Sequence, residues 1–177
     1  MKAILRALLP AVIGLLLTTS CSGAKPQVIY ELASATEFKV AVTITLTPTG
    51  DGQALLSATF TPQEPSLHLY SKDIPKTGLD GLGRPTLLEL AKDSPLQAIG
   101  KLTESAAPEV PTSPPYELLV YPAGSITLTQ QVLLPEGNEW LDDQVVVTYM
   151  ACDDTGCRPP VQEKPIAIKI PARGVLQ

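Results

Sequence analysis

The sequence predicts an all-β domain that folds as a β-sandwich of about nine short strands. The chain holds 18 prolines and 12 glycines among 177 residues, which is too many for a helical bundle and too evenly spread for a disordered tract. Hydrophobic residues make up 44% of the chain, enough for a packed core. Short apolar runs recur between Pro, Gly and Asp residues, which is the pattern of β-strands joined by turns.

The first 20 residues predict a cleaved secretory signal peptide. Lys2 and Arg6 precede an apolar stretch over residues 7–17. At about eleven residues this stretch is shorter than the roughly 20 that a membrane-spanning helix needs. The sequence Leu-Thr-Thr-Ser directly before Cys21 resembles a bacterial lipobox, in which the cysteine becomes the lipidated first residue of the mature protein.

These features divide the chain into a lipoprotein signal peptide over residues 1–20, a tether over residues 21–28 and a β-sandwich over residues 29–173. We expect the mature protein to be lipid-anchored in the bacterial cell envelope and to face the periplasm. Its membrane attachment would rest on the acyl chains, because an acidic protein is not attracted to anionic headgroups. Ser22 after the cysteine resembles outer-membrane sorting, which favours the outer membrane.

The charge balance excludes one class of function. The 13 basic residues are outnumbered by 18 acidic residues, which gives a formal net charge of −5. A nucleic-acid partner bound through a broad basic face is therefore excluded. With one His and three Cys, the chain cannot assemble an all-histidine or four-cysteine metal centre. We expect neither a metal site nor a cofactor.

The clearest strand covers residues 37–47, where apolar residues alternate with Lys, Ala and Thr, so that one face is apolar and the other mostly Thr-lined. A Pro-Thr-Gly-Asp-Gly turn separates it from a strand over residues 54–61, and we expect the two to form a hairpin. Further short strands are predicted over residues 66–71, 85–90, 97–102, 116–121, 125–134, 144–151 and 166–170. No substantial helix is expected after residue 20.

Two segments between the predicted strands have a different composition. Residues 76–85 contain three glycines but lack the Lys-Ser/Thr ending and the following helix of a phosphate-binding loop, so we interpret them as a turn-rich loop. Residues 104–115 contain four prolines and should form an extended, stiff surface segment. His68 lies on a predicted strand. Because it has no acid–base companion nearby in sequence, it is interpreted as a structural or surface residue.

One pair of cysteines, Cys152 and Cys157, remains if Cys21 carries the lipid, and export would place that pair in an oxidising compartment. The four residues between them include Gly156, which lets the chain turn back to disulfide distance. In the chain-entropy model, a disulfide that closes a loop of about six residues stabilises a fold by only about 2 kcal/mol. The pair would therefore contribute little as a structural bridge. A structural bridge and a redox-active bridge stay equally open on these grounds.

The neighbouring residues distinguish the two thiols. Arg158 would stabilise a thiolate at Cys157, whereas the two aspartates that follow Cys152 would disfavour one there. The second cysteine is therefore the better candidate nucleophile. Pro159 and Pro160 stiffen the exit from the loop.

Residues 146–160 read Val-Val-Thr-Tyr-Met-Ala-Cys-Asp-Asp-Thr-Gly-Cys-Arg-Pro-Pro. A strand that ends in Tyr-x-x-Cys, beginning at Tyr149, is followed by a short acidic loop and by Cys-x-Pro-Pro. This run resembles the active-site signature of the N-terminal periplasmic domain of the thiol:disulfide interchange protein DsbD. Weaker likenesses at residues 68–71 and 83–86 extend the resemblance over residues 28–171. The resemblance implies an immunoglobulin-like β-sandwich.

The resemblance also implies a function, that of a thiol:disulfide oxidoreductase of the protein-disulfide reductase type. The pair would pass reducing equivalents to periplasmic thioredoxin-fold oxidoreductases, with Cys157 forming the mixed disulfide and Cys152 resolving it. The family's aromatic cap over the disulfide has no direct counterpart here, and Tyr116 is the candidate substitute lid. The family's multi-helix membrane domain has no counterpart in these 177 residues, so a separate membrane electron donor is a further expected partner.

Two alternatives stay open at the level of sequence. In the first, the sandwich is a non-catalytic module that binds an envelope partner, and the disulfide only holds a loop. In the second, the protein chaperones a soft metal or protects thiols, with Tyr149 and Met150 near the pair, although two thiolates alone are a sparse site. The reduction potential separates exchange from a structural bridge, because structural disulfides lie below about −300 mV.

The lipobox predicts that Cys21 is acylated. In cells supplied with radiolabelled palmitate, the wild-type protein should take up label, and Cys21→Ala should yield an unlabelled product that is unprocessed or soluble. Absence of label from the wild-type protein would remove the lipoprotein interpretation.

Overall fold

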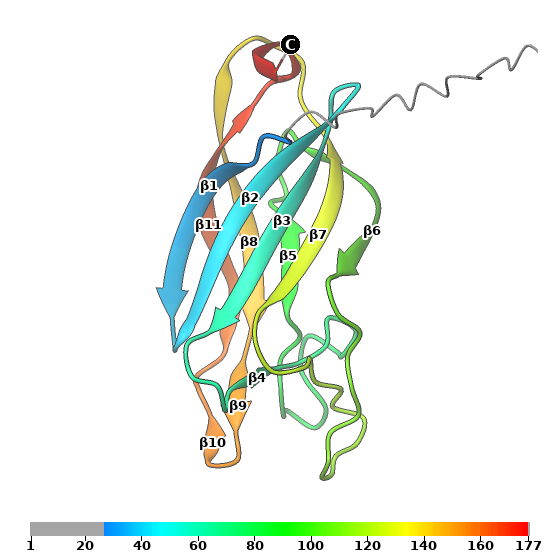
Figure 1. Ribbon diagram of the computed structural model, residues 1–177, viewed down its shortest axis with the longest axis vertical. Helices are drawn as coiled ribbons and strands as arrows, with labels where there is room; N and C mark the ends of the chain where they lie inside the picture. The colour runs from blue at the N-terminus through cyan, green and yellow to red at the C-terminus, as the bar shows by residue number, and fades with distance from the viewer. Residues whose placement is uncertain (1–26, 177) are drawn as a thin grey trace, which may run out of the picture.

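The computed structural model describes residues 27–176, which form eleven β-strands and one short 3₁₀ helix (Figure 1). The strands make three antiparallel sheets, two of which face each other. The expected β-sandwich is therefore confirmed. The expected signal peptide over residues 1–20 and the lipidation site at Cys21 lie outside the described residues.

The larger sheet has five strands in the order β1-β2-β3-β7-β6. These strands span Tyr30–Glu37 (β1), Val40–Gly50 (β2), Gln53–Pro62 (β3), Ile126–Leu133 (β7) and Gln97–Glu104 (β6). Strand β2 shows why the sheet forms, since its Val, Ile and Leu side chains are almost fully buried on one face while its Thr side chains lie on the other. This alternation follows from the two-residue period of a strand.

The facing sheet has three strands in the order β11-β8-β5. They span Val161–Pro171 (β11), Trp140–Tyr149 (β8) and Leu87–Leu90 (β5). The main core lies between the two sheets and is built from their inward aliphatic side chains together with Phe60 and Tyr149, whose rings meet edge to face with centroids 5.6 Å apart. Burial of this apolar surface is the main driving force for the fold.

The outer face of the five-stranded sheet is polar. Hydroxyl groups pair across β3 and β7, with Ser57 and Thr129 2.9 Å apart and Thr59 and Thr127 also 2.9 Å apart. Such cross-strand pairs stabilise a sheet without an apolar cover. The prediction of one apolar and one Thr-lined face is confirmed for β2, but this strand begins at Val40 and not at residue 37, because Phe38 and Lys39 form the turn between β1 and β2.

A third, small sheet lies at one end of the sandwich, at the opposite end from the C-terminal helix η1, Arg173–Leu176 (Figure 1). Its strands are β4 (His68–Leu69), β9 (Ala151–Asp153) and β10 (Gly156–Cys157), in the order β10-β9-β4. Strand β9 begins two residues after β8 ends. The cysteine hairpin is therefore a direct extension of a core strand.

Most elements confirm the sequence analysis, including the β2–β3 hairpin, the turn-rich loop over residues 76–85 and the lack of any helix other than η1 between residues 27 and 176. The strand expected over residues 116–121 is wrong. Within that segment Val120 makes isolated bridges to Tyr70 and Glu109. Prolines flank the segment on both sides, and proline lacks the N–H that a continuous ladder needs.

The sequence does not predict strand β1, because this sheet-edge strand has mixed Ala, Ser, Thr and Glu residues at half-buried or exposed positions. The domain also continues three residues beyond the expected boundary at residue 173, through η1. Within the described part of the chain, no helix has the length and apolar character to cross a membrane.

Phe60 is fully buried, so we expect truncation of its side chain to lower the stability of the fold strongly. Phe60→Ala should lower the free energy of unfolding by about 3–5 kcal/mol, because it leaves a cavity against Tyr149. Thr45→Val, on the outer face and still β-branched, should change it by less than about 1 kcal/mol. Urea denaturation measures both values, and a loss below about 1 kcal/mol for Phe60→Ala would contradict the assigned core.

Candidate functional site

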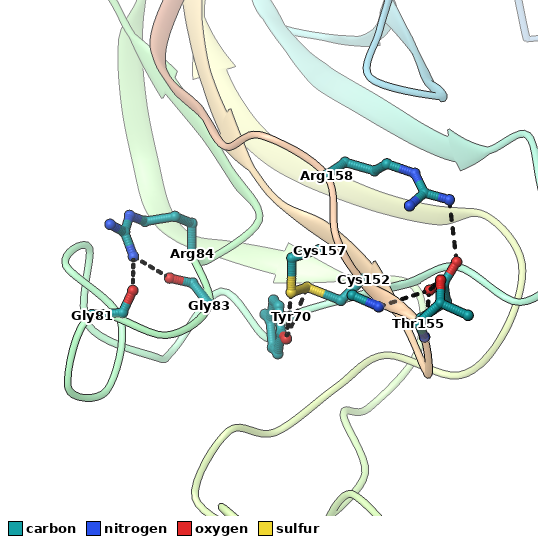
Figure 2. Close-up of a disulfide and its surroundings, with 10 residues drawn as sticks. Tyr70, Gly81, Gly83, Arg84, Cys152, Thr155, Cys157 and Arg158 are labelled. Carbon is teal, nitrogen blue, oxygen red and sulfur yellow. Dashed lines mark hydrogen bonds and ion pairs between the residues drawn. A yellow bond between two sulfur atoms is a disulfide. The ribbon is translucent and has the colours of Figure 1, made fainter.

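Cys152 and Cys157 form a disulfide with an S–S distance of 2.03 Å and a Cα–Cα distance of 4.0 Å (Figure 2). The two residues lie directly opposite each other in the β9–β10 hairpin. The predicted bridge is therefore present, and it joins neighbouring strands rather than distant parts of the fold.

The two sulfur-bearing residues differ in exposure. Cys152 is only 2% exposed and packs in a small apolar cluster with Tyr70, Ile74 and Leu118, separate from the main core. Cys157 is exposed on the edge strand β10. Cys157 is therefore the more accessible of the two residues.

The loop between the cysteines is held by Asp153. One carboxylate oxygen, Oδ1, accepts hydrogen bonds from the backbone N–H groups of Thr155 and Gly156, at 2.9 and 3.1 Å, and from the Thr155 hydroxyl. The other oxygen pairs with Arg158 at 3.2 Å. The hydrogen bonds from Thr155, assisted by Arg158, lower the pKa of Asp153. The carboxylate thus forms an Asx-type turn that closes the hairpin.

The Arg158 guanidinium contacts carboxylates, not sulfur. Its Nη2 lies 3.0 Å from Glu64 Oε2 as well as 3.2 Å from Asp153 Oδ2, and in Figure 2 it points away from the two sulfur atoms. Its charge is therefore offset by two anions. The sequence places Arg158 next to Cys157, but in this structure the Arg158 guanidinium makes its ion pairs with Glu64 and Asp153 and not with the Cys157 sulfur.

Tyr70 is the side chain that contacts the disulfide. Its hydroxyl donates to Cys152 Sγ at 3.1 Å and lies 4.0 Å from Cys157 Sγ (Figure 2). Burial raises the pKa of Tyr70, so the hydroxyl keeps its proton and remains a donor at neutral pH. A hydrogen bond donated to a sulfur atom favours the charged thiolate over the neutral thiol.

Tyr70 is a site residue that the sequence motifs do not single out. The available signal was the apolar stretch around His68, which the resemblance already included. Only the pairing of strand β4 with β9, in which His68 faces Cys152 and Leu69 faces Ala151, brings this stretch to the cysteines.

Backbone contacts on both sides fix the position of Tyr70. Its carbonyl accepts from the Thr86 N–H at 3.2 Å and from the Thr86 hydroxyl at 2.7 Å. The next residue, Ser71, donates its N–H to Leu119 O at 2.9 Å. The segment around Tyr70 is therefore held between β9 and residues 119–121.

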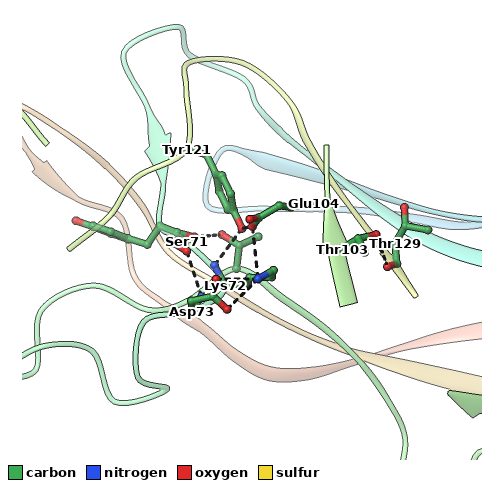
Figure 3. A network of polar contacts seen from close by, with 9 residues as sticks. Ser71, Lys72, Asp73, Thr103, Glu104, Tyr121 and Thr129 are labelled. Carbon is green, nitrogen blue, oxygen red and sulfur yellow. Dashed lines mark hydrogen bonds and ion pairs between the residues drawn. The ribbon is translucent and has the colours of Figure 1, made fainter. Parts of the chain in front are cut away.

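A partly buried polar network continues this anchoring (Figure 3). The Tyr121 hydroxyl donates to Glu104 Oε2 at 2.5 Å and accepts the Lys72 backbone N–H at 3.0 Å. Burial, together with the bond to Glu104, raises the pKa of Tyr121. Since a satisfied buried network is rigid, it ties the segment that carries Tyr70 to the end of β6.

The turn-rich loop over residues 76–85 packs on the same cluster. Arg84 Nη1 donates to the carbonyls of Thr77, Gly81 and Gly83, so the loop closes around one guanidinium (Figure 2). A Cβ atom at Gly83 would lie 3.0 Å from Leu118 Cδ2. The glycine thus permits close packing of the loop next to Tyr70.

The disulfide opens into a cleft of about 510 Å³. Residues 109–115, which include the proline-rich segment, form one wall, and His68, Tyr70 and the cysteine hairpin form the other. The cleft is lined by the carboxylates of Glu109, Asp153 and Asp154 and by no Lys or Arg. A larger cavity of about 710 Å³ lies beside η1 at the far end of the sandwich, and its described lining contains neither Cys nor His.

The other candidate site residues from the sequence do not all lie beside the disulfide. Tyr149 is 3% exposed and belongs to the main core, and its burial raises its pKa to about 12. Pro159 and Pro160 connect β10 to β11. Tyr116 is 53% exposed and does not line the cleft, whereas the prolines directly before it do. The structure thus places the proline-rich segment, and not Tyr116, beside the disulfide.

Residues 27–176 contain no group of three or more His, Cys, Asp or Glu side chains placed to hold a metal ion. Comparison of the chain with protein-family models, with curated proteins and with solved structures finds no match.

The lowered pKa of Asp153 predicts a pH effect on stability. A carboxylate with a depressed pKa in the folded state adds stability that is fully present above the usual value of 3.8 and is lost as the pH falls through the lowered value. Asp153→Asn keeps an acceptor oxygen but carries no charge. The free energy of unfolding should therefore fall less steeply between about pH 5 and pH 2 in this variant than in the wild-type protein.

Asp154→Asn is the matched control, because it removes a charge from the same loop whereas the hydrogen bonds that close the turn go to Asp153. It should keep the wild-type slope. Identical slopes for Asp153→Asn and the wild-type protein would show that the turn does not depend on the charge.

Proposed function

We propose that this protein exchanges disulfides with partner proteins, and that Cys157 is the sulfur through which the partner is bound covalently. The observation that carries the proposal is the contrast between Cys157, exposed at a sheet edge, and Cys152, 2% exposed beneath it. An exchanging pair needs one sulfur that a partner reaches and one that a partner does not reach.

The exchange has two steps. In the first, the Cys157 thiolate attacks one sulfur of a partner disulfide, the partner's S–S bond breaks, and its second sulfur leaves as a thiolate that takes up a proton. In the second, the Cys152 thiolate attacks Cys157 Sγ, the intramolecular disulfide forms, and the partner's first sulfur leaves. The partner gains two electrons and two protons, and the cysteine pair loses them.

Three features support exchange over a purely structural bridge. The disulfide closes a short loop within one hairpin, worth only about 2 kcal/mol in the chain-entropy model. It lies outside the main core, and Cys152 belongs to a separate small cluster. It also faces a cleft, and a hydroxyl donor is held against the sulfur of Cys152.

The resemblance of residues 146–160 to the DsbD periplasmic domain supports a choice of partners. We propose periplasmic thioredoxin-fold oxidoreductases as the proteins that exchange with Cys157, and a separate membrane protein as the electron donor. A lipid on Cys21 would hold the domain at the envelope membrane where both partners meet it.

Trapping tests the roles of the two cysteines. Cys152→Ala should accumulate a covalent complex with a purified, oxidised thioredoxin-fold oxidoreductase, because intramolecular resolution is removed. The complex should appear on non-reducing gels and disappear on reduction. Cys157→Ala is the matched control and should trap little, since its remaining thiol is buried. Trapping by Cys157→Ala alone would reverse the roles.

The free energy of unfolding and the reduction potential test whether the disulfide is redox-active or structural. The double variant Cys152→Ala/Cys157→Ala should lose only about 2 kcal/mol of unfolding free energy, and the wild-type disulfide should have a reduction potential above about −300 mV. A lower potential and a much larger loss of stability, together with no trapping by either single variant, would favour a binding module with a structural disulfide.

A further inference from the structure

The register of the small sheet puts His68 in line with both cysteines. Cys157 pairs with Cys152 across β10 and β9, and Cys152 pairs with His68 across β9 and β4. Residues directly opposite in antiparallel strands project from the same face, with Cβ atoms about 4.5–5.5 Å apart. The imidazole and the disulfide therefore share one face of the sheet, and both line the same cleft.

The ring of His68 is held in place by Tyr70. The two rings meet edge to face, with centroids 5.5 Å apart and an interplanar angle of 84°. The same Tyr70 donates its hydroxyl to Cys152 Sγ. His68 thus belongs to the group of side chains that surrounds the buried sulfur, although sequence alone offered it no acid–base companion.

We propose that His68 accepts the proton of the Cys152 thiol when this residue attacks the mixed disulfide. The proposal rests on the proposed function. In the step, the Cys152 S–H proton passes to an imidazole nitrogen and the sulfur attacks Cys157 Sγ. The bond from Cys157 to the partner breaks, and the partner leaves as a thiolate that takes a proton from the imidazolium or from water.

The resolving thiol needs such a proton acceptor. Cys152 is 2% exposed, so bulk water and buffer have little access to its proton. Tyr70 cannot serve, because its hydroxyl is the donor to this sulfur and burial raises its pKa. Asp153 is engaged by the turn and by Arg158. His68 is the single histidine of the chain, and neutral imidazole is the usual proton acceptor near neutral pH.

The charges around His68 suit this role. The titratable groups that share the cleft with it are Asp153 and Asp154 of the cysteine hairpin, Glu109 of the opposite wall, Tyr70, Cys152 and Cys157. Burial lowers the pKa of His68, although Asp154 and Asp153 oppose this effect, so the ring is neutral above its ordinary pKa of about 6.5. The carboxylates then stabilise the imidazolium that forms during the step.

A two-phase assay with a small disulfide isolates the resolving step. When the reduced protein reacts with dithiobis(nitrobenzoate), attack by Cys157 releases a first coloured thiolate, and attack by Cys152 on the mixed disulfide releases the second. His68→Phe keeps an aromatic ring against Tyr70 but accepts no proton. At neutral pH it should slow the second release about a hundredfold and leave the first release unchanged.

The pH profile separates proton transfer from packing. In the wild-type protein the second release should slow as the pH falls through the lowered pKa of His68, and this inflexion should be absent in His68→Phe and His68→Gln. The variants should approach the wild-type rate well above the ordinary thiol pKa of about 8.5, where hydroxide ionises the thiol. His68→Gln provides the same readout if the Phe variant does not fold.

An unchanged second release in both variants, or an unchanged pH profile, would overturn this inference even if Cys152→Ala traps a partner. A His68-dependent second release without any trapping would leave the inference standing and contradict the proposed function instead. The two proposals therefore fail on different measurements.

Discussion

Burial of alternating apolar side chains between the two facing sheets is the constraint on which the rest of this structure depends. The two-residue period of β2, β3 and β8 sends Val, Ile and Leu inward, and this buried surface fixes the register of these strands. Strand β8 is the central strand of its sheet, so its end has a defined position. The chain continues through Met150 into β9, and the cysteine hairpin is thereby presented on a rigid support.

The site itself is assembled from segments that are distant in sequence. Strand β4 pairs with β9, residues 119–121 pair with the segment after β4, and the loop closed by Arg84 packs beside them. These contacts are mostly backbone hydrogen bonds and a small apolar cluster. They place a hydroxyl donor and an imidazole on the face that carries the disulfide, and the same segments contribute Leu69, Tyr121 and Ala151 to the main core.

The electrostatics of the site differ from what neighbouring residues suggest. Arg158 is adjacent to Cys157 in sequence, yet its guanidinium is paired with Glu64 and Asp153. The cleft is lined by carboxylates and by no cationic side chain. Such surroundings disfavour thiolates in general. The groups next to the buried sulfur are the Tyr70 hydroxyl, which donates to Cys152, and the His68 ring, which packs edge to face on Tyr70.

The sequence by itself determined the all-β class, the hairpin of β2 and β3, the two irregular segments and the disulfide pair, because each follows from local periodicity, turn residues or cysteine spacing. It also singled out Cys157 as the candidate nucleophile. That role stays a prediction, for which the exposure of the residue is a better argument than its charged neighbour. Only the tertiary structure decided which side chains lie next to the disulfide. Tyr70 and His68 are 82 and 84 residues before Cys152, and nothing in local sequence states which strand will pair with β9. That choice is made by long-range backbone pairing and burial, which depend on the whole chain.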